Sequence, residues 1–331
     1  MRRAWSGWRV SLLCLRFCAA CIAAAAGGAQ ADNAAALRQL ERASAAAERL
    51  DYAGTLTEQL GPALQSSRIA HKAGPGGGTE RVELLDGPPR EYRRQGADIL
   101  WYLPQERRVI HERRLGADSF PALSLVSAAA LLGHYRAGAL ARDRVAGRPA
   151  EVTQLLPLDE LRYGYRLWFD VATGLLLRAQ SINEQGQVVR QTGFSQLSVG
   201  APLPRAPAYN TRGWRIEKAV SDPADLRGWT FRIPPGFRQL SAQRRVIGTS
   251  HSGIGVPREV VQVVFSDGLA GISVFIEPWS AARSAHPVQR GAVNMVGKRS
   301  GKFWLTIVGE VPMAAVRQVA DTLEYSVPAI K

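Results

Sequence analysis

The sequence predicts an α+β protein that is built mainly of β-strands, and two observations carry this prediction. Between residues 52 and 198, short stretches alternate apolar with polar residues, and turns rich in glycine and proline separate them. Elsewhere, a few segments repeat apolar residues at the three- and four-residue spacing of amphipathic helices. The length of 331 residues suggests about two domains.

The first 31 residues have the pattern of a secretory signal peptide. Arginines come first, an apolar run spans residues 10–26, and Ala-Gln-Ala at 29–31 offers a cleavage site. We therefore expect cleavage after Ala31 and export of the remaining chain. Two alternatives stay open: a membrane anchor, for which the run is short and interrupted by Arg16, and a lipoprotein modified at Cys21.

Cysteine usage and charge narrow the function classes. All three cysteines lie within residues 1–31, so the exported chain has no disulfide, thiolate metal site or cysteine nucleophile. The signal segment holds four arginines and no acidic residue, so its removal lowers the net charge from +14 to about +10. For an exported protein, this charge favours anionic envelope partners, namely lipid headgroups, lipopolysaccharide phosphates or an acidic protein segment, over nucleic acid.

The elements of the first domain, residues 32–199, begin with a helix. Asn33 can cap it, and Leu37, Leu40 and Leu50 share one face, which predicts a helix over 33–50. Residues 120–132 predict a second, short helix. Strands fill the remainder of this domain. They are expected at 52–59, 64–72, 80–86, 89–95, 98–103, 106–113, 134–146, 150–156, 162–170, 175–182 and 188–198.

A proline-rich linker is expected over residues 200–213, because prolines at this density favour a stiff extended chain. The second domain, residues 214–331, is smaller. Its clearest element is a hairpin over 259–278 with Asp267-Gly268 in the turn. A strand at 303–309 and a final helix from Pro312 to about residue 323 follow.

One face of the predicted sheet is apolar. Arg162, Arg166 and Asp170 alternate with apolar residues and are expected on the solvent side. The apolar side is either a filled core or, where helices cover it incompletely, a groove that suits acyl chains. The groove hypothesis assigns lipid binding to Ile99, Trp101, Leu103, Tyr163, Tyr165, Leu167, Phe169, Leu175 and Leu177.

Arginines gather on or beside neighbouring predicted strands between residues 90 and 114. They form either a solvated face that discourages edge aggregation or a face that binds an anion or an acidic partner. The second interpretation rests on Arg93, Arg94, Arg107, Arg108, Arg113 and Arg114.

A catalytic centre is not evident. The five histidines lack metal-ligand spacing, and the segment GTSHSG at 248–253 departs from the hydrolase motif GxSxG. The glycine-rich segment GPGGGTER lacks the GK[ST] of a phosphate-binding loop. We therefore expect neither an enzyme nor a cofactor, with a hydrolase that uses Ser250 or His251 as an open alternative.

Ordered blocks across the exported chain resemble the RseB/MucB family of periplasmic regulators. They include LDYAGTLTEQ, ERVELLDGPPREYRRQG, RDRVAGRPAEV, RYGYRLWFDVATGLLLRAQ, FSDGLAGISVFIEP and TIVGEVPMAAVRQVADTLE. The resemblance implies that the first domain is an open antiparallel half-barrel with covering helices, like the lipoprotein carriers LolA and LolB. It implies a smaller mixed β/α domain that binds a partner at the C-terminal end.

The resemblance also implies a function. Members of the family bind the periplasmic domain of a transmembrane anti-sigma factor, RseA or MucA, and shield it from regulated proteolysis. Lipid or lipopolysaccharide is expected to release the regulator from the anti-sigma factor and so to activate the envelope-stress sigma factor. A periplasmic lipid or lipoprotein carrier is the alternative, and homo-oligomer formation stays open.

Overall fold

The computed structural model describes residues 14–113, 120–121, 123, 128–138, 141–219, 221–247, 258–280 and 285–326. These residues form one 13-stranded sheet, one seven-stranded sheet, a two-stranded sheet and three α-helices. The prediction of an α+β protein that is mainly β, with an open sheet and a second domain at the C-terminal end, is confirmed.

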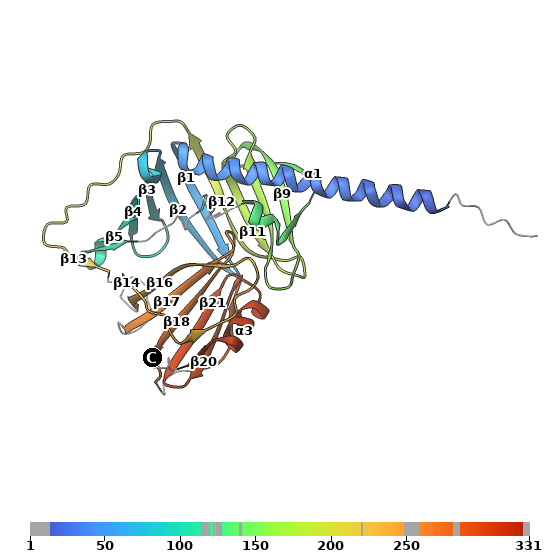
Figure 1. Cartoon of the computed structure of the whole chain (residues 1–331). Coiled ribbons are helices and arrows are strands. Elements are labelled where there is room, and N and C mark those ends of the chain that lie inside the picture. The colour runs from blue at the N-terminus through green and yellow to red at the C-terminus, as the bar shows by residue number, and fades with distance from the viewer. Residues whose placement is uncertain are drawn as a thin grey trace, which may run out of the picture.

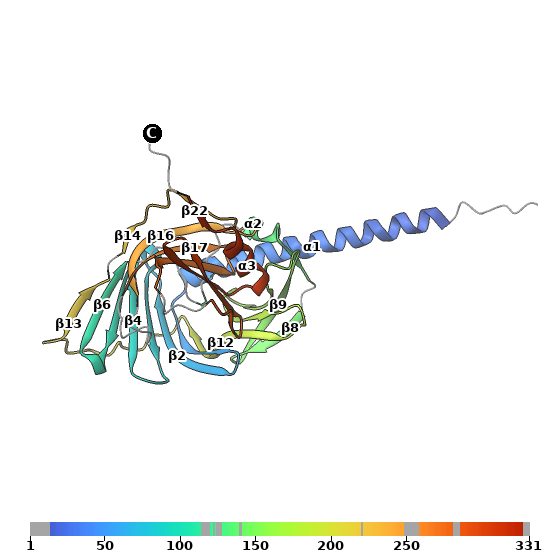
Figure 2. The ribbon, with the colours of Figure 1, turned by 90° about the horizontal axis from the view of Figure 1, so that it is seen from below.

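The first sheet is an open, curved surface in which neighbouring strands run antiparallel, except for β13, which pairs with β6 in parallel. Its order is β13-β6-β5-β4-β3-β2-β1-β12-β11-β10-β9-β7, and β8 also pairs with β9. Figure 2 shows β2, β4, β6 and β13 following one another toward one end. The strands are β1 (Tyr52–Leu60), β2 (Ala63–Lys72), β3 (Thr79–Leu84), β4 (Arg90–Gln95), β5 (Asp98–Leu103), β6 (Arg108–Arg113), β7 (Tyr135–Ala137), β8 (Ala141–Val145), β9 (Arg148–Pro157), β10 (Gly164–Asp170), β11 (Leu176–Ile182), β12 (Val188–Val199) and β13 (Arg215–Lys218).

Each strand predicted in the first domain has a counterpart in the sheet, with one difference. The stretch 134–146, predicted as one strand, forms the two strands β7 and β8. Both pair with β9, at different parts of its length: β7 with Leu155–Pro157 and β8 with residues 148–152. Short 3₁₀ turns, η1 (Pro75–Gly77) and η2 (Pro104–Glu106), connect strands of the same sheet.

Helix α1 (Cys14–Arg49) covers the inner face of this sheet, and its N-terminal part extends beyond the sheet (Figure 1). Ala36, Leu40 and Ala43 lie on its covering face and are fully buried in a cluster with strands β9–β11. The predicted helix over 33–50 is therefore confirmed as the second half of a longer one. Asn33 is not its cap: it lies inside the helix, and its Oδ1 accepts a hydrogen bond from the Ala137 backbone N–H at 2.8 Å.

The described helices are short or only partly apolar. Within the described residues, no helix is long and apolar enough to cross a membrane. The predicted short helix over 120–132 is present at its end as α2 (Ala128–Leu132), whereas residues 122 and 124–127 lie outside the described part of the chain.

The second domain is a sheet with one covering helix. Its order is β14-β16-β17-β18-β21-β20-β19, and the predicted hairpin, strand and final helix are all confirmed within it. Helix α3 (Met313–Thr322) buries Val316 and Val319 against the sheet. The strands are β14 (Ser221–Pro223), β16 (Arg238–Ile247), β17 (Arg258–Ser266), β18 (Gly271–Pro278), β19 (Val288–Arg290), β20 (Val293–Ser300) and β21 (Phe303–Gly309), with β15 (Trp229–Thr230) paired to β22 (Glu324–Tyr325).

Residues 200–214, which we call the strap, contain neither helix nor strand and pass outside strands β3–β5 in Figure 1. The strap is attached to the outer face of the first sheet. Arg93 Nη2 donates to Pro207 O at 2.6 Å, and the Tyr209 ring stacks on Tyr102 with centroids 5.0 Å apart. The strap leads into β13, which belongs to the residue range predicted as the second domain but lies in the first sheet.

Candidate functional site

The hairpin turn between β17 and β18 reaches from the second domain into the first. Asp267, in this turn, forms an ion pair with Arg162 Nη1 at 3.1 Å, and their side chains are 1% and 0% exposed. Tyr135 donates to the same carboxylate oxygen at 3.3 Å. The other oxygen of Asp267 accepts from the backbone N–H groups of Leu269 and Ala270. A turn whose residues favour a hairpin therefore also anchors one domain to the other.

Alternation placed Arg162 and Asp170 on the solvent side, and this prediction was wrong for both. Arg162 is fully surrounded: besides Asp267, it binds Asp159 at 3.0 Å and Pro235 O at 2.5 Å. Asp170 is 1% exposed and pairs with Arg148 at 2.8 Å. Each buried charge has an opposite charge and further hydrogen bonds, which offset the cost of leaving water. No local sequence pattern identifies a partner as distant as Asp267.

Further polar contacts join the domains around this anchor. Arg190 of β12 bridges Glu58 of β1, at 2.7 Å, and Glu310 of the second domain. Although burial lowers the pKa of Arg190, the two carboxylates raise it more, so the net shift is upward. Asn294 Nδ2 donates to Tyr163 Oη at 3.0 Å. These contacts fix the angle between the two sheets by directional bonds.

A close backbone approach requires glycine at the rim of the same joint. Gly291 has φ of +56°, and a Cβ atom there would lie 2.6 Å from the backbone nitrogen of Gly61. The turn between β19 and β20 therefore touches the turn between β1 and β2 without room for a side chain.

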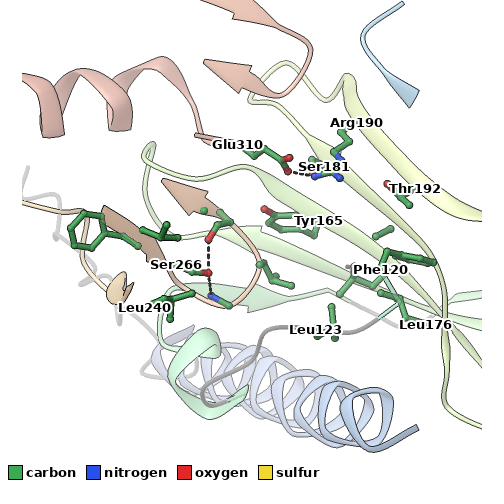
Figure 3. A pocket seen from close by; sticks show the side chains of 18 residues that line it. Phe120, Leu123, Tyr165, Leu176, Ser181, Arg190, Thr192, Leu240, Ser266 and Glu310 are labelled. Atoms are coloured by element: carbon green, nitrogen blue, oxygen red, sulfur yellow. Dashed lines mark hydrogen bonds and ion pairs between the residues drawn. The ribbon is translucent and has the colours of Figure 1, made fainter. Parts of the chain in front are cut away.

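A pocket of about 250 Å³, lined by both apolar and polar side chains, lies between the two domains (Figure 3). Its first wall is the inner face of β10–β12, together with Phe120 and Leu123. Its second wall comes from β16, β17 and the β17–β18 turn, and Arg190 and Glu310 lie at one side. The labelled residues that line it are Phe120, Leu123, Tyr165, Leu176, Ser181, Arg190, Thr192, Leu240, Ser266 and Glu310.

Several polar groups of this pocket are engaged in hydrogen bonds or ion pairs. Ser266 Oγ donates to Ala270 O at 2.7 Å and accepts from the Gly268 N–H at 2.9 Å. Burial raises the pKa of Tyr165 well above its ordinary value, so its hydroxyl stays protonated. The pocket can hold an apolar group and orient it with a hydroxyl donor and the charged pair at its side, which is a binding arrangement.

Of the residues assigned to a lipid groove, some line a cavity and the others are packed against neighbouring side chains. Tyr165 and Leu167 line the pocket, whereas Tyr163 lines a second cavity of about 820 Å³ at the other side of the joint. The others lie in packed surroundings. Ile99, Leu103, Phe169, Leu175 and Leu177 are buried, and the half-buried Trp101 donates to Glu112 at 3.3 Å. Whether any of these residues binds lipid stays a prediction.

The arginines assigned to an anion or partner face do not share one surface. Arg93 lies under the strap and pairs with Glu91 at 2.5 Å, whereas Arg94 pairs with Glu80 at 3.5 Å. Arg108 is buried between Glu106 and Glu217, each at 2.6 Å. Arg107 and Arg113 are exposed, and Arg114 lies outside the described residues. Their role in partner binding stays a prediction.

The described residues contain no group of three or more His, Cys, Asp or Glu side chains that could hold a metal ion. Ser250 and His251 lie outside the described residues, so the structure does not test the hydrolase alternative.

Two family models match this chain in succession. The model of the MucB/RseB N-terminal domain matches residues 35–211, and that of the MucB/RseB C-terminal domain matches 223–324. This chain belongs to the MucB/RseB family. Both of its domains are matched, and the gap between the two models, residues 212–222, begins within the strap, contains β13 and ends within β14.

Members of the MucB/RseB family are similar to this chain over different lengths. The sigma factor AlgU regulatory protein MucB of Pseudomonas aeruginosa is 36% identical over 61% of this chain and 64% of its own length. The aligned part thus spans less than two thirds of that protein. The sigma-E factor regulatory protein RseB of Salmonella typhimurium is 25% identical over 86% of this chain and 89% of its own length.

Solved structures of MucB share the fold. A crystal structure of MucB in complex with MucA(peri) covers 88% of this chain and 100% of its own, with a TM-score of 0.67 and 27% identity. A crystal structure of MucB without a named partner gives a TM-score of 0.65 at 25% identity. The similarity therefore extends through both domains.

Proposed function

We propose that this MucB/RseB family member is a periplasmic negative regulator of an envelope-stress sigma factor. It binds the periplasmic domain of a RseA/MucA-like transmembrane anti-sigma factor and shields that domain from regulated proteolysis. The observation that supports this proposal most directly is the similarity to a MucB structure that contains MucA(peri), over 88% of this chain. The signal-peptide pattern of residues 1–31 supports export to the periplasm.

We also propose that lipid or lipopolysaccharide releases the partner, with an acyl chain in the interdomain pocket. Both domains supply walls of this pocket, and its lining includes Leu167, Leu176 and Leu240. A ligand that fills it changes how the two domains pack. Such coupling requires that the lipid bind more tightly to the domain arrangement that binds the partner poorly. The proposed activity needs no catalytic group.

Binding of the partner is tested by titration. Residues 32–331 are titrated with the periplasmic segment of the anti-sigma factor from the same organism, and lipopolysaccharide is then added to the complex. Tight binding that lipopolysaccharide reverses is the expected result. Uptake of lipid without affinity for the anti-sigma factor would contradict the regulator and favour a lipid or lipoprotein carrier.

The position of the lipid is tested with two matched variants. Leu240 lines the pocket and is 45% exposed, whereas Val171 is 44% exposed and does not line it. Leu240→Glu places a charge in the pocket without removing core packing, so it is expected to weaken release by lipopolysaccharide about tenfold. Val171→Glu is expected to behave as the unaltered protein. Equal release in both variants would exclude this pocket as the lipid site.

A further inference from the structure

We propose a second ligand site, for a phosphate that carries an apolar chain, in a cavity of about 390 Å³ beneath the strap. This cavity lies on the outer face of the first sheet, opposite the face that forms the interdomain pocket. The inference goes beyond the proposed function, because it rests on the cavity's own geometry and charge and needs neither the anti-sigma factor nor the interdomain pocket.

Two rows of paired residues form the floor of the cavity. Strand register places the members of each row side by side across β2, β3, β4 and β5. The first row is Ala70, Arg81, Arg93 and Leu100, and the second is Lys72, Thr79, Gln95 and Asp98. The strap forms the roof with Leu203, Pro204 and Ala206. The cavity therefore combines apolar walls with cationic side chains from a rigid sheet.

Arg81 is the residue that points to a ligand. Its side chain lines the cavity, and the residue is 9% exposed. Within the described part of the chain, its interaction partner is one backbone carbonyl, Arg205 O, at the long distance of 3.4 Å. The guanidinium is mostly screened from bulk water and has no carboxylate within ion-pair distance among the described residues, so its charge is largely uncompensated. A bound anion would supply the opposite charge.

The neighbouring charges leave this positive charge uncompensated. Arg93 is engaged by Glu91 and by Pro207 O. Two carboxylates also line the cavity, and both are engaged: Asp98 accepts from His111 at 2.7 Å, and Glu80 accepts from Tyr92 at 2.7 Å and pairs with Arg94 at 3.5 Å. Lys72 is exposed at the edge of the cavity, and among the described residues no carboxylate lies within ion-pair distance of it. Arg81 and Lys72 together present two positive charges to the same space.

This charge selects a phosphate monoester, which carries about −1.5 to −2 at neutral pH. The guanidinium fork of Arg81 can bind two phosphate oxygens, and the Lys72 ammonium can supply a third contact. Leu100, Leu203 and Pro204 offer an apolar surface beside these cations, so the ligand is expected to carry an aliphatic part. A lipid headgroup combines both features, whereas free phosphate supplies only the first.

The site is tested by calorimetric titration of the purified exported chain, residues 32–331, in the absence of any anti-sigma segment. Dodecyl phosphate below its micelle concentration, inorganic phosphate and neutral octyl glucoside serve as probes. Dodecyl phosphate is expected to bind at least about tenfold more tightly than either other probe, because only it satisfies both the cations and the apolar wall. Inorganic phosphate that binds equally well would overturn the assignment of an amphiphilic ligand.

Variants distinguish this site from every other. Arg81→Gln is expected to weaken dodecyl phosphate binding about tenfold or more, since a hydrogen-bonded charge is lost. Arg227→Gln, which removes an equal charge from a side chain that is 85% exposed, is the matched control. Val171→Glu, at an exposed position that lines neither this cavity nor the interdomain pocket, is expected to leave this binding unchanged.

Two results would overturn the proposal: unaltered binding in a folded Arg81→Gln protein, or an equal loss of binding in Arg81→Gln and in Arg227→Gln. Should Arg81→Gln fail to fold, the exposed Lys72→Gln replaces it, with an expected weakening of about threefold. Unaltered binding in Lys72→Gln would then count against the site. Because these titrations lack the anti-sigma segment, their failure leaves the proposed regulator untouched, and failure of the regulator leaves this site untouched.

Discussion

The two ends of the first sheet are covered in opposite ways. At β9–β11, helix α1 covers the inner face, and Ala36, Leu40 and Ala43 are fully buried there. At β2–β5, the strap covers the outer face through Tyr209, through backbone carbonyls that accept from arginines, and through a few apolar side chains. One cover is a helix with an apolar face, and the other is an extended segment held by directional contacts.

The difference explains what each end can bind. Apolar burial is non-directional and favours contact everywhere, so the helix-covered end becomes a packed core and a pocket remains only where the second domain begins. The strap is held at separate points, such as Arg205 O and Pro207 O, and a cavity stays open near Arg81 beneath residues 203–206. The covering element thus decides whether the vacant space is apolar or cationic.

The largest effect is expected at the ion pair that joins the helix-covered end to the second domain. Asp267→Asn leaves Arg162 buried without its charged partner in the second domain, which is expected to cost about 3–5 kcal/mol of unfolding free energy. Asp225→Asn, which breaks an exposed pair with Arg227, is the control and should cost little, because water screens exposed charges. Urea unfolding of both variants measures the difference, and equal losses would mean that the buried pair does not hold the joint.

A comparison of two leucines tests the contrast between the ends directly. Leu177 is 0% exposed in the packed core, and Leu177→Ala is expected to destabilise the protein by about 2–5 kcal/mol. Leu100 lies half-buried under the strap, so Leu100→Ala leaves no closed cavity and should cost about 1 kcal/mol. Thermal unfolding ranks the two variants. A reversed ranking would show that the strap-covered end is the better packed one.

The smallest effect concerns the pH at which the strap is released. Tyr209 donates to Glu91 Oε2 at 3.1 Å, and burial, followed by the Glu91 charge, raises the pKa of Tyr209 to about 12. The raised pKa means that the attached strap favours the neutral phenol. This contribution is complete below the ordinary tyrosine pKa of about 10 and is lost as the pH rises toward 12.

Tyrosinate absorbance measures this release. In a titration from pH 9 to 13, Tyr209→Phe is expected to lack one phenol that ionises near pH 12, and its strap should lose about 1 kcal/mol of attachment at neutral pH. Tyr325→Phe, in the distant strand β22, serves as the control. If the titration near pH 12 persists in Tyr209→Phe, the strap is not held by this hydroxyl.

The sequence predicted local structure well and distant pairing poorly. Alternation located the strands because one face of each strand meets a core, as with Tyr165 and Leu167. It failed at Arg162, whose partner Asp267 is 105 residues away and belongs to another domain. The proline pattern of the strap predicted an extended segment, but nothing in that pattern shows that Tyr209 stacks on Tyr102. Contacts between domains depend on geometry that no single segment contains.

The path of the strap places the start of the second domain at the far edge of the first sheet. Between β12 and β13 lie seven interstrand spacings of about 4.8 Å each, or roughly 34 Å across the sheet. Residues 200–214 can extend to about 50 Å, so the strap follows the sheet without tension and has only about 15 Å of slack. Both ends of the strap lie in the first sheet, and two residues, 219 and 220, separate β13 from β14 of the second domain. While β13 remains paired to β6, the start of the second domain therefore stays close to this edge of the first sheet. Movement of the second domain against the first is therefore a rotation about a nearly fixed point. Separation of the two domains requires that β13 first lose its pairing with β6.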